Sequence, residues 1–159
     1  MEWKGYNNNG NMEYEIRDGK GNIKEYNNND KLEYEGEYLK GERHGKGKEY
    51  YDNGGLEYEG EYFNGKRHGK GTEYYDHCGH LSFDGEYSNG LRNGKGKEYY
   101  PHYLLEYEGE YLNGEKNGKG KEYNFDGKLE FEGEYLNGER NGKGKEYNLK
   151  PLKRILSDI

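Results

Sequence analysis

A five-residue motif that returns at a nearly constant spacing limits what this chain can fold into. It reads Tyr-Glu-Gly-Glu-Tyr at residues 34–38 and recurs in similar form at 58–62, 83–87, 107–111 and 131–135, so that successive copies start 24, 25, 24 and 24 residues apart. Each copy is followed by an Asn-Gly or Lys-Gly pair, a Gly-Lys-Gly triplet and a Glu-Tyr pair. Such a period is typical of a stack of small units, each buried against its neighbours.

Alternation within the motif predicts β-strands. Residues 57–62 read Glu-Tyr-Glu-Gly-Glu-Tyr, which has the period of two of a half-buried strand. The Asn53-Gly54 pair before them indicates a two-residue hairpin turn, in which both residues need positive φ. Folding the chain about this turn gives four pairs on one face: Tyr51 with Leu56, Glu49 with Tyr58, Gly47 with Gly60 and Gly45 with Tyr62. On the opposite face it pairs Lys48 with Glu59 and Lys46 with Glu61.

This register sorts the side chains by face. Rings and glycines share one face, where the glycines leave space for rings of the neighbouring hairpin, and Lys–Glu pairs occupy the other. Glu49 is the one misfit on the aromatic face. A turn one residue longer would instead place Tyr50 opposite Tyr58 and the lysines beside the rings. We favour the first register and predict an all-β, elongated single antiparallel sheet of tandem hairpins.

The candidate functional residues follow from the same pattern. We expect exposed rings on the aromatic face to anchor a protein partner, and these rings are Tyr34, Tyr38, Tyr51, Tyr58, Tyr62, Tyr75, Phe83, Tyr87, Tyr107, Tyr111, Phe131 and Tyr135. Structural roles are expected for Gly36, Gly45, Gly47, Gly60, Gly69, Gly71, Gly85, Gly94, Gly96, Gly109, Gly118, Gly120, Gly133, Gly142 and Gly144.

Composition narrows the class of protein. Hydrophobic residues make up 28% of the chain, with no alanine or valine, but 20 tyrosines at regular positions favour a folded chain with a thin aromatic core over disorder. The net charge of −7 argues against a nucleic-acid partner. We expect a cytoplasmic, intracellular protein, because the sequence has a single cysteine, no signal-peptide pattern and no long apolar run. Peripheral membrane attachment is an alternative.

No residue cluster in the sequence stands out as catalytic. Glu59 and Glu61 recur in every block, whereas a catalytic pair should be singular, so we expect no enzyme activity and no cofactor. The stretch from His77 to His80 crowds three potential metal ligands into four positions, which suits a divergent turn better than a zinc site. His44 is expected to be a turn residue, and so is His68.

The repeated pattern resembles the MORN repeat family. The shared pattern is Tyr-x-Gly-x-aromatic-x-x-Gly-x-x-x-Gly-x-Gly, as at residues 58–71. The resemblance is strong over 34–147 and weak over 3–33, and the slightly long period is closest to the variant repeats of the family. It implies a non-enzymatic interaction or scaffold module. It also implies two alternatives: a peripheral tether that binds phospholipid, and an antitoxin-like immunity protein.

Three segments are predicted along the chain. Residues 1–33 form a degenerate N-terminal cap, 34–148 an array of about five repeats, and 149–159 a C-terminal segment. Leu152, Ile155, Leu156 and Ile159 have helical spacing, and Pro151 suits a helix start. The helix is interpreted as a cap on the last repeat, with two alternatives: a dimerisation or partner helix, and a membrane-surface helix. Exposed sheet edges also allow self-association into oligomers.

One row of the array is expected to be basic. Arg43, Arg67, Arg92, Lys116 and Arg140 share one position in the repeat, and further lysines lie close to them in sequence. The predicted register sets the lysines opposite glutamates, and neutralised pairs attract anionic lipid weakly. We therefore favour binding of a protein partner over binding of phospholipid.

Overall fold

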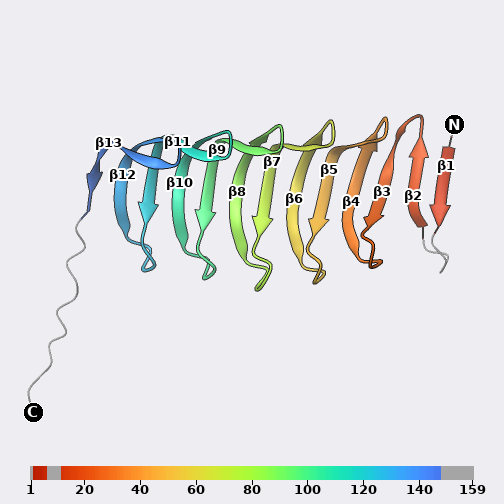
Figure 1. The fold of residues 1–159 in the computed structure, drawn as a ribbon, viewed down its shortest axis with the longest axis horizontal. Coiled ribbons are helices and arrows are strands. Elements are labelled where there is room, and N and C mark those ends of the chain that lie inside the picture. Colours follow the sequence, from red (N-terminus) through yellow and green to blue (C-terminus); the bar gives the residue numbers. More distant parts are fainter. Residues whose placement is uncertain (1, 7–11, 148–159) are drawn as a thin grey trace, which may run out of the picture.

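The computed structural model describes residues 2–6 and 12–147, which form one open antiparallel sheet of 13 strands arranged in sequence order (Figure 1). No helix occurs in these ranges, and the predicted helix within 149–159 lies outside them. The strands are β1 (Glu2–Tyr6), β2 (Met12–Arg17), β3 (Lys20–Tyr26), β4 (Leu32–Leu39), β5 (Glu42–Tyr50), β6 (Leu56–Phe63), β7 (Lys66–Tyr74), β8 (Leu81–Ser88), β9 (Leu91–Tyr99), β10 (Leu105–Leu112), β11 (Glu115–Tyr123), β12 (Leu129–Leu136) and β13 (Glu139–Glu146). The prediction of a single all-β sheet is confirmed.

Two kinds of turn alternate along the sheet. The short turn between β6 and β7 is the pair Asn64-Gly65, with φ values of 49° and 76°, as a two-residue type I′ hairpin requires. The turn between β5 and β6 is longer: the Tyr51 N–H donates to the Gly55 carbonyl at 2.9 Å. Asn53-Gly54 belongs to this longer turn, and only Gly54 has a positive φ, of 85°. The prediction of a two-residue turn there is wrong.

A β-bulge absorbs the extra length of this turn. Tyr50, rather than Tyr51, lies opposite Leu56, so the predicted Tyr51–Leu56 pair is wrong. The register then shifts by one residue, which leaves Glu57 between two paired positions. All the other predicted pairs are confirmed, namely Glu49–Tyr58, Lys48–Glu59, Gly47–Gly60, Lys46–Glu61 and Gly45–Tyr62.

The core is a layer of aromatic rings seated on glycines. The Tyr58 ring lies over Gly60 on its own strand and Gly71 on β7, where an added Cβ would come 2.5 Å from the ring carbon Cζ. Gly47 is covered in the same way by Tyr34 from the preceding hairpin. In the hairpin that turns at Asn53-Gly54, the expectation that a ring of a neighbouring hairpin fills the space above the glycines is confirmed for Gly47, whereas Gly60 lies under Tyr58 of its own strand.

These rings form one unbroken chain along the sheet. Tyr62 packs edge-on against Tyr58 of its own repeat, with ring centroids 5.6 Å apart, and against Tyr34 of the preceding repeat at 5.3 Å. The same T-shaped contacts link ten rings in the order Tyr38, Tyr34, Tyr62, Tyr58, Tyr87, Phe83, Tyr111, Tyr107, Tyr135 and Phe131. Each repeat is therefore stabilised through its neighbours.

Gly71→Ala should lower the free energy of unfolding by about 2 kcal/mol, because the new methyl group overlaps the Tyr58 ring in a packed layer. Gly55→Ala is the matched control. Neither glycine has a positive φ, and a Cβ at Gly55 would meet only the Asn53 side chain. Urea unfolding of both variants measures the difference. Equal midpoints would show that the ring does not need a bare glycine beneath it.

Candidate interaction surfaces

A row of basic side chains covers the aromatic core. The Arg67 guanidinium lies 4.2 Å from the centre of the Tyr58 ring. Equivalent contacts of 4.0–4.5 Å join Arg43 to Tyr34, Arg92 to Phe83, Lys116 to Tyr107 and Arg140 to Phe131. Both the cation–π attraction and the apolar stems of the side chains favour this placement.

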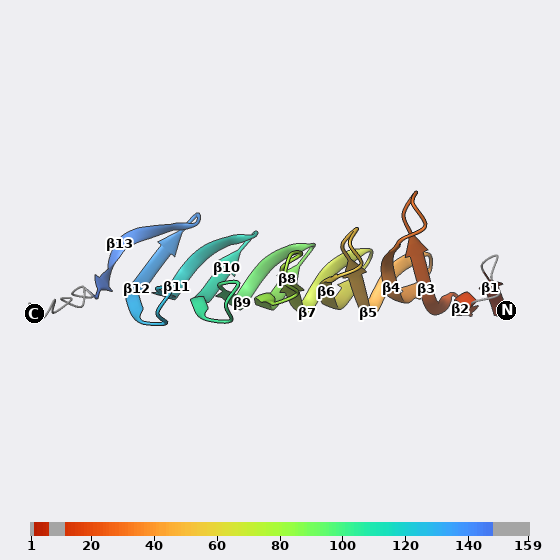
Figure 2. The same cartoon turned by 90° about the horizontal axis from the view of Figure 1, so that it is seen from below.

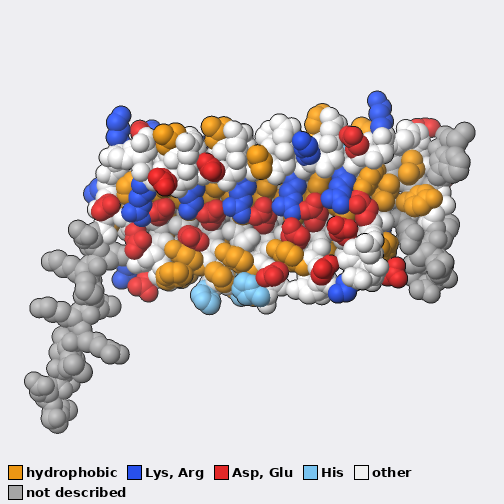
Figure 3. Space-filling model, in the orientation of Figure 1, with side chains coloured by type: hydrophobic (Ala, Val, Ile, Leu, Met, Phe, Trp, Pro, Cys, Tyr) orange, Lys and Arg blue, Asp and Glu red, His pale blue; other side chains and the backbone are white. Residues whose placement is uncertain are grey.

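Glutamates link these cations from one repeat to the next. Arg43 lies 2.8 Å from Glu25 and 2.9 Å from Glu49, and Glu49 also binds Arg67. The alternation continues through Glu73, Arg92, Glu98, Lys116, Glu122, Arg140 and Glu146. We call this row the charge ladder; Figure 3 shows it as alternating blue and red side chains across the face. It gives Glu49 its place on the aromatic face.

The charge ladder closes the aromatic face. Nine of the predicted partner-binding rings are at most 5% exposed: Tyr34, Tyr58, Tyr62, Phe83, Tyr87, Tyr107, Tyr111, Phe131 and Tyr135. Tyr38, Tyr51 and Tyr75 are half-buried, and the hydroxyl groups of the last two donate to Tyr74 and Tyr99 carbonyls. The expectation that these rings are exposed is wrong. A partner on this face would meet the ladder first.

The predicted basic row is also neutralised. Arg43, Arg67, Arg92, Lys116 and Arg140 each contact glutamates of the charge ladder, so their row presents little free positive charge.

The opposite face of the sheet carries a groove. Its two stretches, of about 1290 Å³ and 700 Å³, both include Lys70 and together extend from β2 to β13. Glycines, lysines and acidic side chains line it. The strands that form it are curved, as the view from below shows (Figure 2).

Only one of the two lysines in a typical repeat is paired within the groove. Lys48 lies 3.8 Å from Glu59, and the equivalent pairs are Lys24–Glu35, Lys97–Glu108 and Lys121–Glu132. The second lysine forms no ion pair with any residue in the described ranges. This second set, which we call the lysine row, comprises Lys46, Lys70, Lys95, Lys119 and Lys143.

A backbone bulge brings main-chain N–H groups to carboxylates beside the lysine row. Gly45 has a φ of 68°, and its bulge turns the N–H of Lys46 toward the Glu37 carboxylate, which accepts it at 3.0 Å. Glu86 accepts the Lys95 N–H at 2.9 Å, and Glu110 accepts the Lys119 N–H at 3.2 Å. These three carboxylates therefore bind main-chain N–H groups, and no ion pair joins them to the ammonium groups of the lysine row.

Tyrosines of the groove face bind the other carboxylates. The Tyr74 hydroxyl donates to Glu59 at 2.6 Å, and the Tyr123 hydroxyl donates to Glu108 at 2.8 Å. Burial, reinforced by this hydrogen bond, raises the pKa of Tyr74 to about 12, and the same causes raise the pKa of Tyr123 to about 12. On the opposite face burial raises the pKa of Tyr62 far above its usual range.

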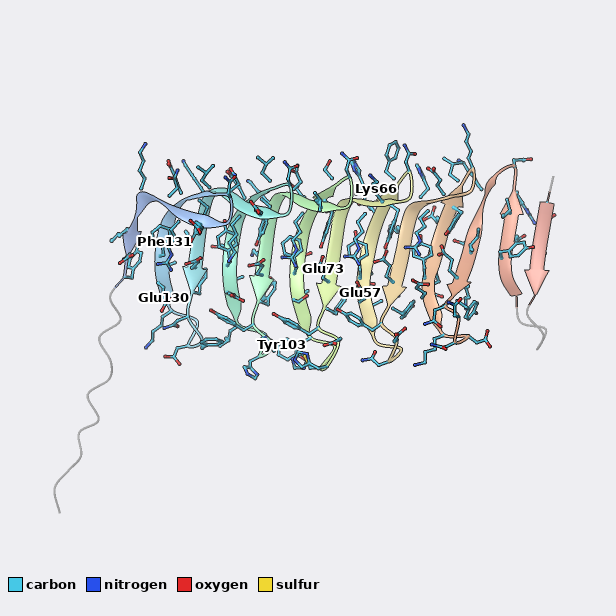
Figure 4. The ribbon with its side chains drawn as sticks, in the orientation of Figure 1. Glu57, Lys66, Glu73, Tyr103, Glu130 and Phe131 are labelled. Atoms are coloured by element: carbon cyan, nitrogen blue, oxygen red, sulfur yellow. The ribbon has the colours of Figure 1, made fainter. Side chains whose placement is uncertain are left out.

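The long turns form an irregular rim. Tyr103, labelled on this rim in Figure 4, has a φ of 67°, a conformation that is strained for a bulky residue. It is 63% exposed, and its ring stacks on His80 with centroids 3.8 Å apart. Tyr100 stacks on the 70% exposed Phe125. This cluster was not predicted from the sequence, although Tyr103 occupies the turn position that Gly54 and Gly127 fill elsewhere.

The histidines form no metal site with other residues in the described part of the chain. No group of three or more His, Cys, Asp or Glu side chains is arranged there to hold a metal ion. His44 and His68 lie in β5 and β7, not in turns, and both rings contact Phe63. The turn prediction for them is wrong because the strands extend through the bulge. Within the same ranges no helix is long and apolar enough to span a membrane.

Arg67→Ala should lower the free energy of unfolding by about 2 kcal/mol, because it removes charge-assisted hydrogen bonds to Glu49, Glu57 and Glu73 and uncovers Tyr58. In Lys48→Ala, which removes a lysine 47% exposed, the change should stay below about 0.5 kcal/mol. Urea unfolding compares the two. A small loss for Arg67→Ala would mean that the ladder adds nothing to the core.

Alkaline pH should unfold the protein. In the unfolded chain the pKa of tyrosine is about 10, whereas in the folded protein the pKa of Tyr74 and that of Tyr123 are about 12. The stability that depends on protonated phenols is therefore complete below about pH 10 and falls as the pH rises toward 12. Urea midpoints and phenolate absorbance, followed together, test this. Phenolate formation by all tyrosines near pH 10 in a protein that stays folded would contradict it.

Comparison with known proteins agrees with the repeat geometry. The MORN repeat model matches residues 34–56, 58–77, 83–101, 107–128 and 131–147, which correspond to the strand pairs from β4 to β13. The comparison with curated proteins returned no match. Because the five matched segments cover more than half of the chain, this protein belongs to the MORN repeat family.

Proposed function

We propose that this chain is a non-enzymatic interaction module that binds an extended acidic polypeptide of a partner protein in its groove. The observation that carries the proposal is the lysine row, whose ammonium groups form no ion pair among the described residues. The aromatic face is closed by the charge ladder, so the groove is the better candidate for binding.

The charges of the groove favour a narrow ligand. Glutamates such as Glu59 and Glu132 are 42% and 50% exposed there, beside their lysine partners. A flat anionic bilayer would approach both signs of charge at once and gain little. Glutamates also lie opposite four members of the lysine row on the neighbouring strands, namely Glu61, Glu86, Glu110 and Glu134. A single extended chain can place carboxylates at the lysines and neutral residues over the glutamates between them, so a protein partner is favoured over phospholipid.

The test uses a fluorescent, proline-free peptide rich in Asp and Glu. It should bind the full chain with an affinity that falls as salt is added. Lys70→Ala, Lys95→Ala and Lys119→Ala combined should weaken binding about tenfold, since three exposed ion pairs are lost. A triple alanine variant of the exposed turn residues Lys31, Lys40 and Lys128 changes the net charge equally and is the control.

Two results would overturn the proposal. One is equal loss of binding in both triple variants, which would show that net charge alone attracts the peptide. The other is failure of the peptide to bind while phosphatidylserine vesicles sediment with the protein, which would favour the membrane-tether alternative.

A further inference from the structure

A second row of side chains runs beside the lysine row with the same period. It consists of the strand-end residues next to the short turns, and all but Leu39 are 49–51% exposed: Leu39, Phe63, Leu91, Leu112 and Leu136. Phe63 follows the buried Tyr62 and therefore points to the groove face, two residues beyond Glu61, or about 7 Å along the strand. We call these residues the apolar row.

In the third repeat, which comprises β8 and β9, the apolar side chain comes from the second strand instead of the first, so the apolar row stays continuous. Ser88 stands where the other repeats have Leu or Phe, but Leu91 lies directly opposite Ser88 across the short turn, and paired residues point to the same face. Leu91 also reaches toward the next short turn, where a Cβ on Gly114 would lie 3.9 Å from Leu91 Cδ2. Every repeat thus contributes one apolar side chain.

The spacing of both rows selects a ligand conformation. Members lie two strands apart, about 9.6 Å. Three residues of a polyproline II helix make one turn of about 9.3 Å. Seven residues of an α-helix span about 10.5 Å, and same-face residues of a β-strand are only about 6.7 Å apart. From Lys46 to Lys143 the mismatch grows to about 1 Å for polyproline II and about 4 Å for an α-helix.

Backbone chemistry favours the same conformation. A ligand that follows the rows crosses the strands, whose N–H and C=O groups already bond within the sheet. It gains no main-chain hydrogen bonds from the inner strands. A polyproline II chain needs none internally, and prolines reduce the entropy that it loses on binding.

We infer that the groove, if it binds polypeptide as proposed above, recognises a proline-rich segment in the polyproline II conformation with an acidic residue at every third position. The carboxylates of this ligand lie at the members of the lysine row, and its residues without charge lie over the glutamates that alternate with them from strand to strand. An edge of prolines or other apolar residues lies on the apolar row. Its repeat of three residues matches one repeat of the protein.

The experiment compares two peptides of equal composition on the full chain by fluorescence anisotropy. One has five Glu-Pro-Pro units; in the other the five glutamates are grouped at one end. The regular peptide should bind about tenfold more tightly, because only it can place a carboxylate at each lysine of the row. Phe63→Ser with Leu112→Ser should weaken the regular peptide, whereas Leu104→Ser on the opposite rim should not.

The outcomes separate this inference from the proposed function. Equal affinity for the two peptides, lost in the Lys70, Lys95 and Lys119 variant, would overturn the three-residue spacing and leave acidic-peptide binding intact. Undiminished binding by the Phe63 and Leu112 variant would overturn the role of the apolar row. Failure of both of these peptides and of the proline-free acidic peptide would overturn the proposed function as well.

Discussion

The sheet depends on one contact that recurs in each repeat, the packing of an aromatic ring over a pair of glycines. A single layer of strands has no second layer to bury against, and this chain has few aliphatic residues with which to build one. Gly60 and Gly71 remove two side chains from adjacent strands, and Tyr58 fills the space they leave. Tyr62 then ties that ring to the repeat before it. Burial is shared between neighbours, which makes the repeats cooperative.

The charge ladder covers this core, and it makes the two faces of the sheet chemically different. Arg67 shields a ring that water would otherwise reach, and Glu49 and Glu73 balance its charge. The rings of the aromatic face are thereby buried in contacts that stabilise the sheet. On the groove face the bulge at Gly45 engages the Glu37 carboxylate with a main-chain N–H and leaves Lys46 free. The lysine row, whose members form no ion pair with any described residue, therefore lies on the groove face.

Departures from the repeat gather in its middle and do not interrupt either face. Thr72 and Asp84 replace a Lys–Glu pair between β7 and β8, and the Ser88–Leu91 exchange follows on the next strand pair. Tyr103 accepts a left-handed backbone where other long turns use glycine. These changes fall on side chains that the ring chain does not use, which is why the core passes through them unchanged.

The sequence by itself determined the strands, the pairing of Gly47 with Gly60 and the single sheet, because period-two alternation and a constant repeat are local properties that the printed order of residues contains. It did not reveal that the Asn53-Gly54 turn is longer than two residues, since that length depends on a bulge at Glu57. Nor did it separate Lys46, which is free, from Lys48, which is paired. Only the tertiary structure decided these points and the burial of Tyr58, because each depends on where a neighbouring strand places an arginine, a carboxylate or a main-chain N–H.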